Sequence, residues 1–173
     1  DAQPYLERAL GIMQQSLGQD HIRTSDFYLL VGKNLLALNR VVDAELPLRR
    51  CFSIREKATD GETLRAEARY FLGQALARLG SYNEALNLNV VGLELIERAA
   101  KRSEARVAYN LHAIGVILIA LGRSEEAVPY LERALSIRRN LREEELRANL
   151  QRLAETQFAL AQALWVPARG ARH

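Results

Sequence analysis

The chain has 173 residues, of which 49% are hydrophobic, 26% charged and 6% aromatic, and its formal net charge is +3. This length suits one domain with a continuous core, and the composition excludes a low-complexity disordered chain. A single cysteine excludes a disulfide framework. The longest apolar run, residues 113–121, is too short to span a bilayer.

The small net charge is not typical of a nucleic-acid binder, which gathers basic residues on one face. No basic-then-apolar leader is present in the sequence. We therefore expect a cytoplasmic protein that binds neither nucleic acid nor membrane and needs no cofactor.

The sequence repeats itself with a period close to 42 residues. The phrase AQPYLERALGI begins at residue 2 and returns as AVPYLERALSI at residue 127. The alanines that carry the period are separated by 42, 41, 42 and 44 residues and are Ala2, Ala44, Ala85, Ala127 and Ala171. Twelve residues before each later alanine stands a second small residue, at Gly32, Gly73, Gly115 and Ala159. A fixed period of this size indicates a stack of similar helix pairs.

In chain order, the pattern predicts a lone helix, three helix pairs and a final helix. The first helix of each pair is called the A helix and the second the B helix. The lone first helix, over 2–17, is B-type; the pairs span 22–57, 61–101 and 104–140, and the final A-type helix spans 143–165. The predicted helices within the pairs cover 22–39, 41–57, 61–79, 82–101, 104–121 and 124–140. Residues 1–166 thus form a single array, followed by a basic tail over 167–173.

Small residues that recur at the same position of each repeat, that is, at the same phase, predict where helices cross closely. Glycine inside a helix costs about 1 kcal/mol relative to alanine, so its recurrence at Gly32, Gly73 and Gly115 implies a packing role that outweighs this cost. Cys51 holds the matching small-residue phase of a B helix. We therefore expect it in the core and not as a nucleophile.

These positions resemble the tetratricopeptide repeat. The resemblance rests on Leu72–Gly73 and Ile114–Gly115 in A helices, followed by Ala127, Leu131 and Ala134 in a B helix. The 42-residue step is similar to the variety found in kinesin light chains and many bacterial proteins. The resemblance implies an all-α fold, an α-solenoid of about eight antiparallel helices, in a bacterial protein.

No residues are spaced for catalysis or for metal binding. A nucleophile needs a base within reach and a group that orients this base. His112 has no serine or acid at helical neighbour spacing, and no histidine, cysteine or carboxylate cluster has metal-ligand spacing. The sequence therefore predicts a protein that is not an enzyme.

The resemblance implies that the A helices line a concave groove that binds a protein or peptide. Residues three before, one after and four after each small A-helix residue would face it. The candidate groove residues are Lys33, Tyr70, Gln74, Tyr109, His112, Val116, Ile119 and Leu160. The same rule adds Leu29, Leu36, Ala77, Thr156 and Ala163, and Asp26 and Glu67 join Tyr109 one turn earlier on their helices.

The helix over 104–121 sharpens this expectation. Residues 113–121 are apolar on every face, and such a helix is expected to be buried on all sides. Packing within the array covers two sides, which leaves Val116 and Ile119 as a hydrophobic floor for an apolar anchor of a peptide. The alternative is that the array itself, or a swapped neighbour, covers the same patch.

Three functions are compatible with these features. The leading hypothesis is a protein-interaction scaffold. The second is a C-terminal sensor or regulatory segment of a bacterial signalling enzyme such as a serine/threonine kinase, because the phrase AETQFALAQALW is similar to the closing repeats of such kinases. The third is a helical-repeat RNA binder, which needs a period of about 35 residues and one base-reading pair of polar residues per repeat. The 42-residue step and the apolar Val116 and Ile119 argue against it.

The repeat pattern starts on a B-type helix and stops on an A-type helix. Apolar residues at both ends therefore lack a partner helix. We expect a segment cut from a longer array, or a protein whose ends are covered by another chain, including a homo-oligomer through these apolar ends.

Overall fold

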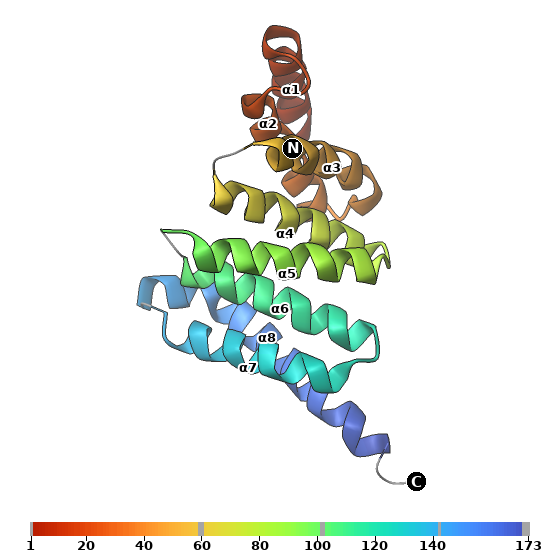
Figure 1. The fold of residues 1–173 in the computed structure, drawn as a ribbon, viewed down its shortest axis with the longest axis vertical. Helices are drawn as coiled ribbons and strands as arrows, with labels where there is room; N and C mark the ends of the chain where they lie inside the picture. Colours follow the sequence, from red (N-terminus) through yellow and green to blue (C-terminus); the bar gives the residue numbers. More distant parts are fainter. Residues whose placement is uncertain (1, 59–60, 101–102, 142, 171–173) are drawn as a thin grey trace. The chain divides into compact units, whose positions relative to one another are not determined.

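The computed structural model describes residues 2–58, 61–100, 103–141 and 143–170; for 143–149 and 166–170 it describes the backbone alone. These ranges hold eight α-helices and no strand (Figure 1). In order they are α1 (Gln3–Leu17), α2 (Ile22–Ala37), α3 (Val41–Lys57), α4 (Glu62–Arg78), α5 (Tyr82–Arg98), α6 (Glu104–Ala120), α7 (Ser124–Arg139) and α8 (Glu143–Gly170). The predicted all-α fold is confirmed. Within the described residues, no helix is both long and apolar enough to cross a membrane.

Most helix bounds agree closely with those expected from the repeat period. The exception is α8, which we expected to end at residue 165, before Pro167. Its backbone instead stays helical to Gly170. A proline inside a helix gives up one backbone hydrogen bond, and here that loss does not end the helix. Of the expected basic tail, residues 171–173 lie outside the described ranges.

The helices divide between two compact units, Asp1–Leu95 and Ile96–His173. In unit 1, α2 packs on α1 and α3, and α3 packs on α4; α4 and α5 lie side by side (Figure 1). In unit 2, α7 packs on both α6 and α8. Contacts also join A helices directly, α2 to α4 in unit 1 and α6 to α8 in unit 2. That the two units act as one array stays a prediction.

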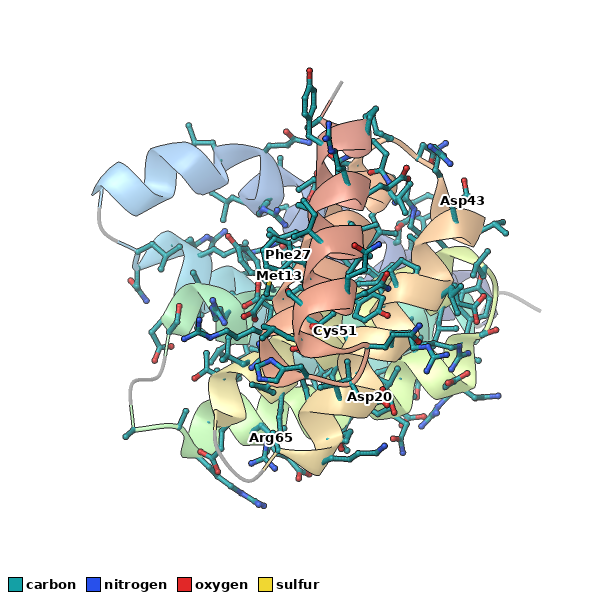
Figure 2. The ribbon with its side chains drawn as sticks, turned by 90° about the horizontal axis from the view of Figure 1, so that it is seen from above. Met13, Asp20, Phe27, Asp43, Cys51 and Arg65 are labelled. Carbon is teal, nitrogen blue, oxygen red and sulfur yellow. The ribbon has the colours of Figure 1, made fainter. Side chains whose placement is uncertain are left out.

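The recurring glycines are the points where an A helix touches its own B helix. A Cβ atom built on Gly32 would lie 2.5 Å from Leu48 Cδ2, and one built on Gly115 would lie 2.5 Å from Leu131 Cγ. Such distances are too short for carbon atoms in contact, so only glycine allows these helices to approach so closely. Cys51, labelled in Figure 2, is completely buried, as its phase predicted. The packing roles read from the repeat are therefore confirmed.

Each of the first three A helices ends in the same turn. The residue after the helix end has positive φ, at Asn39 (60°), Gly80 (84°) and Gly122 (75°). The following N–H donates to a carbonyl five residues back; the Arg40 N–H reaches the Leu35 carbonyl at 2.9 Å, for example. This is the Schellman arrangement, which favours glycine or asparagine because other side chains resist positive φ.

Candidate functional site

In unit 1, the facing surfaces of α2 and α4 are joined by a lysine. Lys33 Nζ lies 3.2 Å from Glu67 Oε1 and 4.7 Å from the centre of the Phe71 ring. Tyr70 meets the Phe71 ring edge-on, with the ring centres 5.1 Å apart. The Gln74 amide donates to the Tyr70 hydroxyl. The three predicted residues Lys33, Tyr70 and Gln74 are thus half-buried and bonded within the protein.

In unit 2, α6, α7 and α8 enclose a polar cluster around Thr156, whose side chain is fully buried. The Arg138 guanidinium, also buried, donates to the Thr156 hydroxyl and to the Arg152 carbonyl. The Thr156 hydroxyl itself donates to the Arg152 carbonyl at 2.8 Å. His112 Nδ1 lies 3.2 Å from the same hydroxyl oxygen.

The Thr156 hydroxyl thus lies within hydrogen-bond distance of both the Arg152 carbonyl and His112 Nδ1, and the tautomer of the His112 ring sets which of the two groups donates in the second contact. Burial lowers the pKa of His112 to about 4, with the positive charges of Arg138 and Arg152 lowering it further and Glu155 opposing them. The ring is uncharged near pH 7.

Tyr109 lies under two arginines. The Arg152 guanidinium carbon is 4.5 Å from the centre of the Tyr109 ring, and that of Arg138 is 5.7 Å away. The Arg138 side chain is buried, whereas Arg152 is exposed to solvent. A guanidinium over an aromatic ring is held by the electrons of the ring face without losing its charge. Arg152 is therefore a positioned cation on an accessible part of unit 2.

Further along α6, the apolar floor is partly accessible. The Val116 side chain is 42% exposed, and Ile119 is half-buried. Ile119 lines an open cleft of about 360 Å³ together with Ala161, Gln162 and Trp165 from α8. Leu160, the predicted partner on α8, is half-buried and is not among the residues lining this cleft.

The resemblance predicted which positions of the A helices face a groove, and only some of these positions are accessible to solvent. Val116 is exposed and the other seven candidate residues are half-buried. Of the five positions that the same rule adds, Ala77 is half-buried, whereas Leu29, Leu36, Thr156 and Ala163 are buried.

Sequence reasoning missed the residues that complete unit 2. These residues are Trp165, which lines the cleft, and Arg138, whose side chain is buried although a pair of arginines on a helix usually lies on a solvated face. A signal was present in the repeat: Arg55 occupies the same phase in α3, is also buried, and pairs with Asp26. An arginine repeated at one phase beside the core indicates a bonded residue.

A larger hollow of about 610 Å³ lies in unit 1 among α1, α2 and α3. It mixes apolar walls with charged side chains; its lining includes Glu7, Leu10, Leu35, Arg40, Asp43 and Arg50. It holds none of the predicted groove residues. No group of three histidine, cysteine or acidic residues within the described ranges could hold a metal ion.

Comparisons with known proteins agree with this architecture. Residues 64–140 match the family model described as tetratricopeptide repeat. No curated protein matches the chain.

Solved structures match over most of the chain. A Podosopora anserina protein assigned to the kinesin light chains, with nearly identical TPR-like repeats, is 22% identical with a TM-score of 0.70, covering 99% of this chain and 88% of that one. A TPR-like protein from Chlorobium tepidum is 21% identical with a TM-score of 0.68, covering 80% and 92%. YrrB, a TPR protein with an unusual peptide-binding site, is 20% identical with a TM-score of 0.56, covering 90% and 73%. Residues 64–140 thus match the tetratricopeptide repeat, and the chain is similar in fold to kinesin light chain TPR-like repeats.

Proposed function

We propose that the chain is a protein-interaction scaffold that binds a peptide segment on the α6–α8 surface of unit 2. The observation that carries this proposal is the open cleft between Ile119 and Trp165, which continues the exposed apolar surface of Val116. A cleft of this size accepts one bulky side chain. The anchor of the peptide is therefore a leucine, isoleucine, methionine or aromatic residue.

Farther along the same two helices, Arg152 on α8 lies nine residues before Ala161 of the cleft, about 14 Å along the helix. The Arg152 guanidinium lies over the Tyr109 ring, and guanidinium groups prefer carboxylates as partners. His112 is neutral near pH 7 and does not add a second cation. A peptide with one acidic residue about four residues away from its apolar anchor suits this arrangement.

Unit 1 is the weaker candidate surface. Lys33 is engaged by Glu67 and Phe71, and Gln74 is bonded to Tyr70. A ligand there has to replace these contacts. We therefore place the primary site in unit 2 and treat Lys33, Tyr70 and Gln74 as a secondary surface.

The peptide-binding site named for YrrB supports peptide binding by a chain of this fold, although at 20% identity it carries no information on sequence preference. The hypothesis of a regulatory segment depends on which domains the same gene encodes next to this chain. It is compatible with the same peptide site. The RNA-binding hypothesis gains no support from the apolar cleft.

The test is selection from a random peptide display library on the immobilised chain, followed by affinity measurement with a labelled selected peptide. We expect enrichment of peptides in which an acidic residue stands about four residues away from a bulky apolar one. Replacing Val116 and Ile119 together by serine should weaken binding at least about tenfold, because each removes about 1 kcal/mol or more of apolar contact.

The matched control is Val42→Ser, which also removes an exposed valine but lies on α3. It should bind like the unchanged chain, and circular dichroism should show that all variants keep their helical content. Peptides that bind the double variant and the unchanged chain equally well would contradict the proposed site.

A further inference from the structure

Ion pairs link neighbouring B helices at two positions of the repeat. Each position is counted from the alanine that carries the period at that helix, namely Ala2, Ala44, Ala85 or Ala127. Five residues after the alanine of α3, Arg49 Nη1 lies 2.7 Å from Glu84 Oε1, which stands one residue before the alanine of α5. Six residues after the alanine of α7, Arg133 pairs with Glu97, which stands twelve residues after the alanine of α5. The repeat thus provides two positions at which one B helix is bonded to the next.

Between α1 and α3, the residues needed for both ion pairs are missing. Counted in the same way, the first position holds two acids, Glu7 and Asp43. The second holds an amide and a cation, Gln14 and Arg50. Among the described residues, no ion pair joins α1 to α3. All four residues instead line the hollow of about 610 Å³ that lies among α1, α2 and α3.

Within the described part of the chain, Glu7 and Arg50 have no opposite charge bonded to them. Asp43, labelled in Figure 2, is neutralised by Arg40, whose Nε lies 2.7 Å from Asp43 Oδ2. Glu7 accepts a hydrogen bond of 2.6 Å from the neutral Gln3 amide. Both Glu7 and Arg50 are exposed to solvent. One carboxylate and one guanidinium of this hollow are therefore available to a ligand.

The two charges lie at opposite ends of the hollow. Seven residues separate Glu7 from Gln14 on α1, and the same number separates Asp43 from Arg50 on α3. This spacing is about 10 Å along a helix. The ion pairs of the other B helices place Glu7 level with Asp43, and Gln14 level with Arg50. Between these ends lie apolar side chains of both helices, which are Leu10, Leu46 and Pro47.

The apolar middle of the hollow is not a general feature of the repeat. The Leu46 side chain is 68% exposed. The same position, two residues after the alanine, holds Asn87 on α5 and Pro129 on α7. The repeat therefore does not require leucine here, whereas a ligand in the hollow gives this leucine an apolar partner.

We propose that this hollow binds a small zwitterion with an apolar body, whose ammonium lies at Glu7 and whose carboxylate lies at Arg50. A guanidinium prefers a carboxylate, with which it forms two parallel hydrogen bonds. The volume of about 610 Å³ is within the usual range of small-molecule sites. The hollow shares no residue with the α6–α8 peptide surface.

A short peptide with free ends has the required chemistry. It carries an ammonium at one end and a carboxylate at the other, and an extended chain of three residues spans about 10 Å. Apolar side chains on these residues suit Leu10 and Leu46 in the middle of the hollow. The ligand class is therefore a tripeptide of apolar residues with free ends.

The experiment is an NMR titration of the full chain with leucyl-alanyl-leucine in four forms: with free ends, with an acetylated N-terminus, with an amidated C-terminus, and with both ends blocked. The form with free ends should bind most tightly and shift amide signals of α1 and α3. Blocking one end should weaken binding roughly three- to fivefold, the effect of one solvent-exposed ion pair. Blocking both ends should weaken it about tenfold or more, because the two ends act independently.

Three variants assign the ends of the ligand. In Arg50→Gln, amidation should no longer change the affinity, whereas acetylation should still weaken binding. In Glu7→Gln, acetylation should lose its effect and amidation should keep it. Both side chains are exposed, so these variants keep the fold. Gln14→Glu supplies the acid that the repeat has at Glu97, and it should pair with Arg50 and weaken binding of the forms with a free carboxylate.

The matched control is Arg133→Gln, which removes an arginine at the same repeat position that is already paired with Glu97. It should bind all four forms like the unchanged chain. Absence of binding, equal affinity for the four forms, or signals that shift only in α6 and α8 would overturn the proposal. So would an effect of amidation that persists in Arg50→Gln. Val116 and Ile119, which test the α6–α8 surface, do not line this hollow, so failure of one proposal is distinguished from failure of the other.

Discussion

His112 connects α6 to α8 through the Thr156 hydroxyl, and its ring is charged only in acid. In the unfolded chain its pKa returns to about 6.5, whereas in the folded protein it is about 4. Between these values the unfolded state binds more protons than the folded state. The free energy of unfolding therefore rises with pH across this window.

The expected result is a stability contribution that is constant above about pH 6.5 and is lost as pH falls toward 4. The loss is roughly 2 kcal/mol once the partial exposure of the ring is allowed for. Urea unfolding measured at several pH values should show this slope. The slope should flatten in His112→Gln but persist in His21→Gln, since His21 is exposed and only caps α2. An unchanged slope in His112→Gln would contradict the assignment.

Among the helices, the contact of Gly115 with Leu131 determines how closely α6 and α7 approach. Alanine favours a helix over glycine by about 1 kcal/mol, but here its methyl group meets the leucine side chain. We expect Gly115→Ala to lower the free energy of unfolding by about 1–3 kcal/mol, the usual cost of overpacking.

The effect of Gly115→Ala on the free energy of unfolding should change sign when the Leu131 side chain is shortened. In the background of Leu131→Ala, which itself loses about 2–5 kcal/mol, Gly115→Ala should stabilise by about 1 kcal/mol. Four unfolding curves complete this double-mutant cycle. Equal effects of Gly115→Ala in both backgrounds would show that the glycine is not required for close packing.

At the scale of the whole molecule, the two compact units have separate sets of helix contacts. Stability in repeat proteins is close to a sum of local and nearest-neighbour contributions. A cavity made in one unit should therefore lower the stability of the helices mainly within that unit.

Hydrogen exchange under native conditions tests this expectation. Leu131→Ala should speed exchange of the amides of α6 and α7, while the amides of α2 and α3 keep the protection of the unchanged chain. Leu48→Ala in unit 1, which removes the equivalent buried leucine, should give the opposite pattern. A uniform loss of protection in both variants would show that the chain unfolds as a single cooperative body.

The sequence by itself determined the helices and their order. The period places small residues at Gly32, Gly73 and Gly115, and those positions depend only on the phase along each helix. The same phase identified Cys51 as a core residue, which its burial confirms. It also predicted that Val116 keeps an exposed side, because a helix that is apolar all round has more apolar surface than two neighbours cover.

Only the tertiary structure decided which side chains of the A helices remain accessible and what they contact. Exposure depends on which helix lies opposite, and partners from three helices meet at Thr156 although they are far apart in sequence. The groove rule therefore misplaced Leu29 and Leu36, which neighbouring helices bury. For the same reason, the phase along α7 did not predict that Arg138 is buried, because its partners Arg152 and Thr156 come from α8.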